Sequence, residues 1–343
     1  MHHVVVDAPR RVSVVEVPDP SLPGPDGAVV AVELSSICGS DLHFYEGDIP
    51  VGDGVPIGHE FIGTVAEVGP EVRRFKPGDR VLTASVTGCG YCEGCRTGDP
   101  IRCERGPKVF GSGELGSAQA TMVAVPSADF QMLAIPEGVS DEAALLLTDN
   151  LCTGWIGAKR AGVVDGATVV VLGLGAVGLC AVRCALAQGA GRVLVADPVR
   201  ARRERAVRSG GTSLEGETVR AVLDATDGRG ADAVIDCVAL DATLDDAFNS
   251  VRAGGTLSVL GVHDLNPYPL QILLGLFRSL TLRMTTAPVH QTWAELIPLV
   301  VKGRLQTDGI FTHRFPLSSA PEAYAAMARR GGDCMKVILE ATE

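Results

Sequence analysis

Apolar segments that alternate with helical segments between residues 168 and 260 constrain the fold of this chain more than any other feature. Fully apolar strands joined by helices indicate a parallel sheet that is covered on both faces. The sequence therefore predicts a doubly wound α/β domain in this region. The expected strands are Thr168–Leu172, Arg192–Asp197, Ala231–Val238 and Thr256–Leu260, and the expected helices are Ala176–Gln188, Val199–Ser209 and Thr243–Val251.

A glycine-rich turn with the pattern G-x-G-x-x-G joins the first strand to its helix. Gly173 permits the tight turn, Gly175 lets the backbone approach a pyrophosphate, and Gly178 allows the helix to pack closely on the strand. Val177 lies within the same turn, whose free N–H groups favour an anion. Asp197 closes the next strand, 19 residues beyond Gly178. This context predicts a dinucleotide site rather than a purely structural turn.

The residues after the second strand bear on which dinucleotide binds. Asp197 is expected to accept hydrogen bonds from the adenosine ribose and to repel a 2′-phosphate, which favours NAD over NADP. A basic run follows, formed by Arg200, Arg202, Arg203 and Arg205. These arginines either form a solvated helix face or include one that binds a 2′-phosphate. We assign Arg202 to the cofactor site.

Length and composition limit the class of protein. A chain of 343 residues with 46% hydrophobic and 21% charged residues forms two domains more readily than one and is not disordered. Its net charge of −11 argues against nucleic acid or an anionic membrane as a partner. Neither a signal-peptide pattern nor a membrane-spanning run is visible. We therefore expect a cytoplasmic protein that acts on a small-molecule substrate.

The first half of the chain is rich in short apolar runs bounded by Gly, Pro and Asp, which predicts strands. Ser140, followed by two acids, marks a helix start. The alternating pattern ends near Ala287, and a return of the later chain to the first domain is expected. The predicted domains are a catalytic domain over 1–150 and 288–343, and a cofactor domain over 151–287. The other expected elements are strands Val29–Leu34, Phe61–Val68 and Arg80–Thr83 and helices His290–Lys302 and Ser318–Arg329.

Four of the ten cysteines, Cys89, Cys92, Cys95 and Cys103, lie within 15 residues. Cytosolic thiols stay reduced, so such a cluster indicates a metal before a disulfide. Tight C-x-x-C spacing lets four thiolates enclose one tetrahedral zinc ion, and a closed four-sulfur shell has a structural role. An iron–sulfur cluster is the alternative for this spacing.

A second group of metal-binding residue types is spread along the chain. Cys38 begins the segment Cys-Gly-Ser-Asp, His43 follows shortly after it, and His59 stands in Gly-His-Glu. Taken singly, a cysteine is more often a buried small hydrophobe and a histidine more often a hydrogen-bonded core residue. It is the combination of these residues with the cysteine cluster and the glycine turn that indicates a functional site.

The order of these features resembles the zinc-containing medium-chain dehydrogenase/reductase (alcohol dehydrogenase) family over essentially the whole chain. The resemblance implies a β-rich, GroES-like catalytic domain beside a Rossmann cofactor domain, and two zinc ions per chain. It implies a catalytic zinc held by Cys38, His59 and, five residues before Gly154, Asp149. Many members of the family have cysteine at that last position, and Cys152 is the alternative here, although its spacing is wrong.

The resemblance also implies roles around the catalytic zinc. Ser40 and His43 are expected to relay the proton between the substrate and solvent through the nicotinamide ribose. Asp41 is expected to orient His59, and Glu60 to adjoin the zinc and bind it transiently. For His43 the alternative is an ordinary surface histidine. Ser85, Phe110 and Trp155 are expected to line the substrate pocket, although core packing explains the last two equally well.

The expected activity is hydride transfer between NAD(H) and an alcohol/carbonyl pair, by a homodimer or homotetramer paired through its cofactor domains. Segments around residues 119–129 and 147–155 resemble the branch of glutathione-independent formaldehyde dehydrogenases and related alcohol dehydrogenases. Polyol or amino-alcohol oxidation is the alternative within the family. A zinc-independent quinone or enoyl reductase would lack the zinc ligands, and a non-catalytic zinc- or cofactor-binding protein would not need Ser40 and His43.

Overall fold

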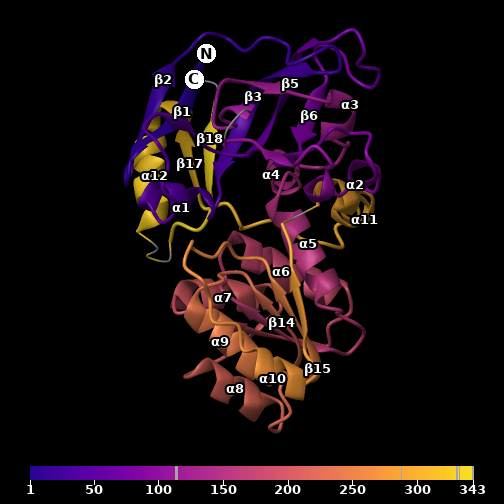
Figure 1. Ribbon diagram of the computed structural model, residues 1–343, viewed down its shortest axis with the longest axis vertical. Coiled ribbons are helices and arrows are strands. Elements are labelled where there is room, and N and C mark those ends of the chain that lie inside the picture. Colours follow the sequence, from indigo (N-terminus) through magenta and orange to yellow (C-terminus); the bar gives the residue numbers. More distant parts are fainter. Residues whose placement is uncertain (113–114, 287, 330, 332, 342–343) are drawn as a thin grey trace.

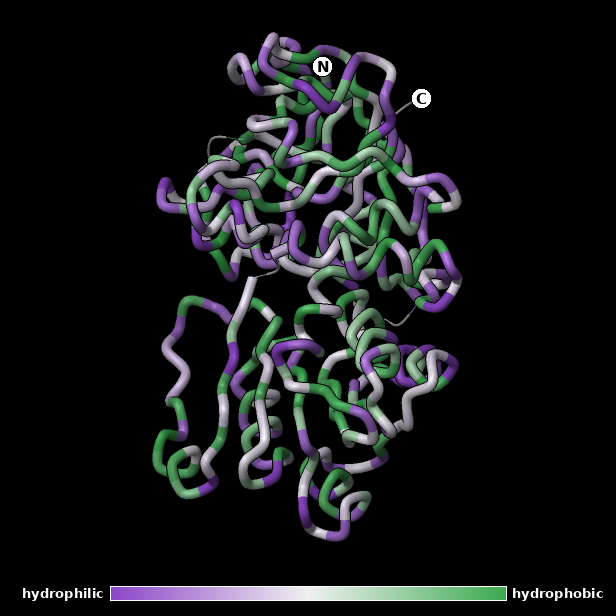
Figure 2. Tube along the Cα trace, turned by 90° about the vertical axis from the view of Figure 1, so that its right-hand side faces the viewer, coloured by the Kyte–Doolittle hydropathy of each residue, from purple (hydrophilic) through white to green (hydrophobic). Residues whose placement is uncertain are grey.

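The computed structural model consists of two lobes that stack along the long axis of the molecule (Figure 1). The structure describes residues 1–112, 115–286, 288–329, 331 and 333–341. Figure 2, turned by 90°, shows the same two lobes one above the other. Among the described residues, no helix is both long and apolar enough to cross a membrane.

The lower lobe in Figure 1 is built on a parallel sheet with six strands in the described part of the chain. The strand order is β13-β12-β11-β14-β15-β16, so the direction of winding reverses between β11 and β14. Such a switch point is where open α/β sheets bind their ligands. The elements are β11 (Thr168–Leu172), α6 (Ala176–Ala187), β12 (Arg192–Ala196), α7 (Arg200–Arg208), β13 (Thr212–Ser213), α8 (Thr218–Ala225), β14 (Ala231–Asp236), α9 (Asp241–Ser250), β15 (Val251–Val259), α10 (Ile272–Phe277) and β16 (Thr281–Met284).

Burial explains why this sheet was predictable from sequence. Val169, Val170 and Val171 in β11 are each 0% exposed, because helices cover both faces of the sheet. The doubly wound fold is confirmed. The strand β13 has two residues and β16 is largely exposed, so neither carries the apolar run on which the prediction relied.

The upper lobe is β-rich. Its largest sheet has the strand order β10-β6-β5-β3-β18-β17, with β9 also paired to β3, among the described residues. The strands are β1 (His2–Ala8), β2 (Arg11–Glu16), β3 (Ala28–Ile37), β4 (Val55–Pro56), β5 (Glu60–Val68), β6 (Arg80–Thr83), β7 (Val86–Thr87), β8 (Lys108–Val109), β9 (Met122–Val125), β10 (Met132–Ala134), β17 (His313–Pro316) and β18 (Val337–Glu340). The helices are α1 (Asp41–Glu46), α2 (Glu93–Arg96), α3 (Ala128–Gln131), α4 (Asp141–Leu146), α11 (Val289–Val301) and α12 (Ala320–Ala328), with short 3-10 turns at Pro100–Arg102 and Leu317–Ser319. The helix α5 (Asn150–Arg160) runs from the junction of the lobes and packs against α6 of the lower lobe (Figure 1).

The chain returns to the upper lobe after the cofactor sheet. The strand β18 pairs antiparallel with β3, with Val337 opposite Ile37, and β17 pairs parallel with β18. In Figure 1 the yellow C-terminal strands accordingly lie beside the indigo and violet N-terminal ones. This pairing brings residues near both ends of the chain to the edge of the upper lobe that faces the cofactor lobe.

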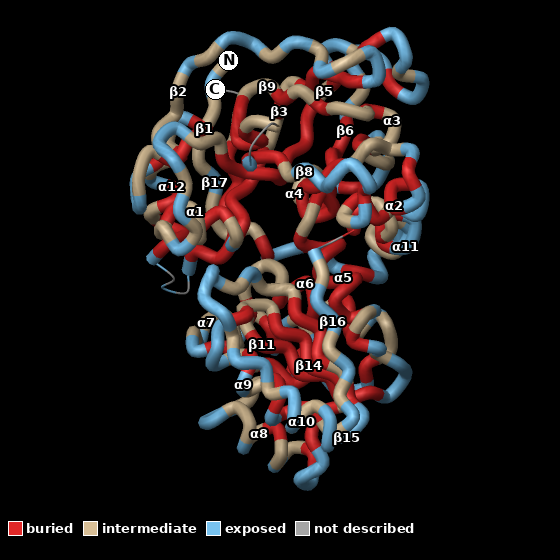
Figure 3. Tube along the Cα trace, viewed as in Figure 1, coloured by how far each residue is buried: buried red, intermediate tan, exposed pale blue. Residues whose placement is uncertain are grey.

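The connection between the lobes is buried. Ser140 caps α4 by accepting a hydrogen bond from the backbone N–H of Ala143, as its sequence predicted. The side chains of Leu145, Leu146 and Leu147 then pack in a core that extends to Val169 and Val171 of β11. Figure 3 shows this buried material, in red, at the centre of both lobes. The turn between α4 and α5 is therefore held firmly against the interface between the lobes.

Candidate active site

One cavity of about 1250 Å³ contains residues from both lobes. The upper lobe contributes Cys38, His59 and Asp149 to its wall, and the lower lobe contributes the glycine turn and Asp197. Ligand sites commonly lie in such clefts between domains. The metal-binding and nucleotide-binding residues predicted from sequence thus share a single cleft.

The structure places Cys38, His59, Glu60 and Asp149 in one group, with a donor atom from each within 4.8 Å of the others. Cys38 follows β3, His59 precedes β5, and Asp149 lies at the start of α5. A thiolate, an imidazole and a carboxylate are a normal ligand set for catalytic zinc, which keeps one position open. The donor set formed by Cys38, His59 and Asp149 therefore fits the expected ion.

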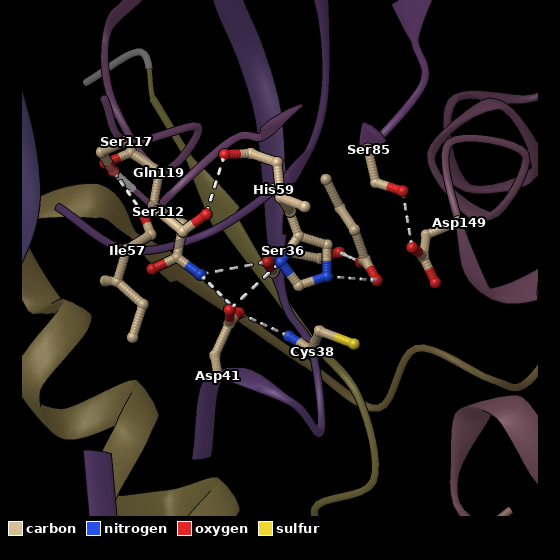
Figure 4. A network of polar contacts seen from close by, with 12 residues as sticks. Ser36, Cys38, Asp41, Ile57, His59, Ser85, Ser112, Ser117, Gln119 and Asp149 are labelled. Atoms are coloured by element: carbon tan, nitrogen blue, oxygen red, sulfur yellow. Dashed lines mark hydrogen bonds and ion pairs between the residues drawn. The ribbon is translucent and has the colours of Figure 1, made fainter. Parts of the chain in front are cut away.

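The charges around His59 favour a cation. Burial lowers the pKa of His59, but the negative charges of Asp41 and Cys38 raise it, and the net direction is upward. Its Nδ1 lies 3.3 Å from Asp41 Oδ1, which leaves Nε2 for a metal (Figure 4). Asp41 is 1% exposed, and it also accepts the backbone N–H of Cys38 at 2.9 Å. One carboxylate therefore contacts both ligand residues.

Asp149 is oriented by its own set of partners. Ser85 Oγ donates to Asp149 Oδ2 at 2.7 Å, as Figure 4 shows. Asn150 Nδ2 and Thr153 Oγ1 donate to Asp149 Oδ1 at 3.1 and 3.2 Å. These hydrogen bonds fix the orientation of the carboxylate in the cleft.

Glu60 is held by a buried cation. Lys336 Nζ contacts Glu60 Oε2, and both side chains are 1% exposed. Ser36 Oγ donates to the same oxygen, and Asn150 Nδ2 donates to Glu60 Oε1 at 2.7 Å. Burial lowers the pKa of Lys336, but the charge and hydrogen bond of Glu60, together with the charges of Cys38 and Asp149, raise it, and the net direction is upward. Both carboxylate oxygens thus have hydrogen-bond partners, and Oε1 also lies 4.0 Å from His59 Nε2, so Glu60 adjoins the metal group.

The glycine turn has the geometry that a nucleotide site requires. Gly173 has a φ of +79°, and a Cβ there would lie 2.1 Å from Val238 Cγ2. A Cβ on Gly178 would lie 1.9 Å from the carbonyl oxygen of Gly173, whereas one on Gly175 would meet nothing within 4 Å. Val177 lines the cavity beside them. The open space at Gly175 is where a pyrophosphate can approach the backbone.

Asp197 and Arg202 lie together at the far end of this site. Asp197 accepts the backbone N–H groups of Leu174 and Val199 at 2.8 and 2.7 Å. Arg202 Nη1 lies 3.7 Å from Asp197 Oδ2, and its buried Nε makes no hydrogen bond. Its side chain is 20% exposed, so it is not part of a solvated helix face. That interpretation holds better for Arg200, which is 84% exposed.

Ser40 and His43 stand at the start of α1, on the wall of the same cavity. The Ser40 side chain makes no capping hydrogen bond to the helix. His43 Nδ1 lies 3.2 Å from Asp48 Oδ2, which directs Nε2 away from Asp48. His43 is 20% exposed and therefore reaches both the cavity and solvent.

The four clustered cysteines form a second group of possible metal ligands, separate from the group around Cys38. The sulfur atoms of Cys89, Cys92, Cys95 and Cys103 all lie within 4.8 Å of one another. The backbone N–H groups of Cys95 and Glu104 lower the pKa of Cys92, whereas burial raises that of Cys95. A Cβ on Gly88 would lie 2.5 Å from Cys95 Sγ, so the loop is too tight for a larger residue. The four sulfurs fit a structural zinc ion.

Two further sequence-based expectations have clear outcomes. Cys152 is fully buried and donates to the carbonyl of Leu147 at 3.1 Å, outside the metal group. Trp155 is not among the residues that line the cavity, so of the two interpretations given for it, core packing holds. Its ring is in the core and its Nε1 donates to Glu295 at 2.8 Å. Ser85 and Phe110 do line the cavity.

Several residues of the site were not identified from sequence. Gln119, Asn150, Tyr324 and Lys336 contact the metal group or its partners. A single lysine within the otherwise apolar run Met335–Leu339 was a usable signal, because an unpaired lysine is almost never fully buried. The others are ordinary polar residues whose partners are distant in sequence.

Comparisons with known proteins agree with this geometry. Residues 24–137 match the alcohol dehydrogenase GroES-like domain, and residues 176–302 match the zinc-binding dehydrogenase domain. A probable zinc-binding alcohol dehydrogenase of Mycobacterium tuberculosis is 54% identical over 99% of this chain and 88% of its own length. The two domain models and this relative together span nearly all of the sequence.

Solved structures show the same fold. An alcohol dehydrogenase from Thermus sp. ATN1 superimposes with a TM-score of 0.92 at 37% identity, over 99% of each chain. A Sinorhizobium meliloti protein assigned as a zinc-binding dehydrogenase and solved with NADP has a TM-score of 0.83 at 29% identity, over 99% of this chain and 98% of its own. Zinc-ligand chemistry, fold and relatives converge, and the chain belongs to the zinc-containing medium-chain alcohol dehydrogenase family.

Proposed function

We propose that this oxidoreductase transfers a hydride between NAD(H) and an alcohol/carbonyl pair at the Cys38–His59–Asp149 site. The observation that supports the proposal most strongly is that these three residues and the glycine turn line the same cavity. A zinc ion held there would supply a Lewis acid for the substrate oxygen and lower the barrier to hydride loss. A non-catalytic binding protein would have no need to bring the two sites together.

The chain's own residues account for proton movement in this scheme. Ser40 can both donate and accept a proton, and it lies at the start of the helix that carries His43. With Nδ1 directed at Asp48, His43 can take up a proton at Nε2 and pass it to solvent. Asp41 keeps Nε2 of His59 directed into the cleft. The roles of Ser40 and His43 are part of the proposal.

We propose NAD as the preferred cofactor because Asp197 presents a carboxylate where the adenosine ribose would lie. Both of its oxygens already accept backbone N–H groups, so the carboxylate is fixed in place. Arg202 offsets part of this charge at 3.7 Å, which keeps some affinity for NADP. The NADP found in the Sinorhizobium relative fits such a secondary preference.

The wall of the cavity near the upper lobe favours an apolar substrate. It includes Phe44 of α1, Ile49 shortly after α1, Val86 of β7, Ile101 of the 3-10 turn Pro100–Arg102 and Val109 of β8. Such side chains offer no hydrogen bonds to the extra hydroxyl groups of a polyol. We propose an alcohol with an apolar substituent, in preference to the polyol or amino alcohol alternative.

We also propose that two copies pair through their cofactor lobes. Strand β16 lies at one end of the cofactor sheet, so its outer edge has no strand partner among the described residues. The nearby side chains of Leu276, Phe277 and Met284 are 72%, 80% and 67% exposed. An exposed apolar edge of this kind is rarely left uncovered in a stable protein.

Turnover assays test the proposed activity directly. Purified protein is given a panel of primary alcohols, secondary alcohols, polyols and aldehydes with NAD or NADP, and the absorbance of the reduced cofactor is followed. The proposal predicts turnover of apolar alcohols, with NAD preferred. Turnover of polyols alone would refute the proposed substrate class, and no turnover of any alcohol or aldehyde would refute the activity.

A further inference from the structure

We propose that Tyr324, Gln119 and Asp41 form a positioning chain that fixes the orientation of the two metal ligands Cys38 and His59. The proposal rests on the proposed function for the identity of the metal, but not for the contacts themselves. It assigns a role to α12, which carries Tyr324 and lies near the C-terminal end of the chain.

Asp41 is the point at which the chain meets the ligands. Its Oδ1 lies 3.3 Å from His59 Nδ1, and its Oδ2 accepts the backbone N–H of Cys38 at 2.9 Å. Rotation of this one carboxylate would therefore disturb a ligand ring and a ligand backbone together. Residues that hold such a carboxylate influence metal affinity without touching the metal.

Gln119 holds Asp41 in this rotamer. Its Nε2 donates to Asp41 Oδ2 at 3.1 Å and to the carbonyl of Ser36 at 3.2 Å, and the side chain is 0% exposed (Figure 4). No water can replace these bonds at such a buried position without opening the core. Both N–H groups of the amide are thus committed to acceptors next to Cys38.

Tyr324 completes the hydrogen bonds of the Gln119 amide. The Tyr324 hydroxyl donates to Gln119 Oε1 at 2.8 Å, and Tyr324 is also 0% exposed. If the amide turned over, its oxygen would face the Asp41 carboxylate and the Ser36 carbonyl, which are both acceptors. These two acceptors set the orientation of the amide, and the Tyr324 hydroxyl holds it there by donating to the one remaining acceptor, Gln119 Oε1.

An independent observation places Gln119 against the backbone of a ligand. Gly58, the residue before His59, has a φ of +94°, and a Cβ there would lie 2.4 Å from Gln119 Cγ. The Gln119 side chain thus occupies the space that any larger residue at position 58 would need. The positioning chain thus contacts the ring of His59 through Asp41 and the residue before His59 through Gln119.

The test compares Tyr324→Phe with Tyr45→Phe in the full-length, zinc-loaded protein. Tyr45 is a matched control because its ring packs on that of Tyr324 at 5.3 Å and is also buried. Zinc transfer to a colorimetric chelator is followed over time. The phase of zinc release that is missing in Cys38→Ser belongs to the site next to the cofactor. Release from the four-cysteine site serves as an internal reference.

The proposal predicts that Tyr324→Phe speeds zinc release from the Cys38 site by about tenfold, at the lower end of effects seen for residues behind metal ligands. Release from the four-cysteine site and both phases of Tyr45→Phe should match the wild type. In the Co²⁺-substituted protein, Tyr324→Phe should also shift the absorption bands of the Cys38 site, because those bands depend on ligand geometry.

Two results would overturn the positioning chain. Equal acceleration of both phases in Tyr324→Phe would show a general loss of stability, and no acceleration would show that the hydroxyl is dispensable. Gln119→Met keeps the length of the side chain but removes its hydrogen bonds. This variant should release zinc from the Cys38 site faster than Tyr324→Phe does. A wild-type protein that releases only one zinc ion would refute the proposed function as well.

Discussion

At the scale of single residues, Asp197 combines observed backbone contacts with a proposed contact to the cofactor. Its carboxylate is expected to meet the ribose, and it accepts the backbone N–H groups of Leu174 and Val199. Asp197→Asn keeps an acceptor oxygen but removes the charge that repels a 2′-phosphate. We predict that the preference for NADP over NAD rises about tenfold, which corresponds to about 1.4 kcal/mol. The ratio of kcat/KM values for the two cofactors measures the change.

Arg202→Gln provides the matched control for this prediction. Arg202 offers the charge that a 2′-phosphate would use, so its removal should shift the preference further toward NAD. An unchanged cofactor ratio in both variants would contradict the placement of the adenosine ribose at Asp197.

Lys336 carries a stability prediction. Lys336→Met leaves the buried carboxylate of Glu60 without its cation, and breaking a buried ion pair in this way costs about 3 to 5 kcal/mol. Urea unfolding of the zinc-loaded protein measures the loss. The double variant Lys336→Met/Glu60→Gln should recover part of it, because no unpaired charge remains. A single variant as stable as the wild type would contradict the pairing.

Residues were predictable from sequence to the extent that their chemistry is local. Cys38 and His59 stand in short motifs with characteristic spacing, so the motif names them. Lys336 acts through a partner 276 residues away, and Gln119 through one 78 residues away. Contacts at that separation depend on how the strands pair, which no local pattern records.

At the scale of elements, an ion-pair cluster joins three strands of the cofactor sheet. Asp232 in β14 accepts the N–H of Thr168 at the start of β11, and its partners include Arg229 and Arg252 of β15. The Arg229 guanidinium, with smaller contributions from Arg252 and Thr168, holds the pKa of Asp232 well below its usual range, although burial raises it. The carboxylate is therefore more acidic in the folded chain than in the unfolded one.

This difference predicts a pH dependence of stability. Because the folded pKa lies below the unfolded value of about 3.9, the stabilisation is complete above that pH and is lost as the pH falls below it. Asp232→Asn should remove this part of the slope in unfolding free energy against pH. Asp224→Asn, which breaks an exposed pair with Arg220, should leave the slope nearly unchanged. Equal slopes in wild type and Asp232→Asn would contradict the argument.

The exposed edge of the cofactor lobe predicts how two copies associate. Leu276→Glu together with Phe277→Glu places charges on the face next to β16 and should convert an oligomer to monomers. Val164→Glu is the control, since this side chain is 64% exposed and belongs to neither α10 nor β16. Sedimentation measures the mass in solution. A double variant that keeps the wild-type mass would contradict pairing through this edge.

Elements were predictable where burial shapes the sequence on its own. The strand β11 and the helix α6 follow from an apolar run and a glycine turn. The helix α8 and strand β16 were not predicted, because one is short and the other is exposed along most of its length. The pairing of β18 with β3 joins opposite ends of the chain, so sequence indicated a return but not its register.

At the scale of the whole molecule, the two lobes matter because the cleft between them joins a metal site to a nucleotide site. Each lobe alone presents only half of the residues that the reaction needs. The fold places Asp149 on the buried connection between α4 and α5, so one ligand is fixed at the interface of the lobes. Removal of one metal ligand should therefore disable the chemistry and leave cofactor binding intact.

Zinc content, NAD affinity and turnover of Cys38→Ser test that claim most directly. The account predicts two zinc ions per chain in the wild type and in Cys152→Ser, and a single zinc ion in Cys38→Ser. That variant should bind NAD with nearly unchanged affinity but show no measurable alcohol oxidation. Wild-type turnover by Cys38→Ser, or two zinc ions retained in it, would contradict the account.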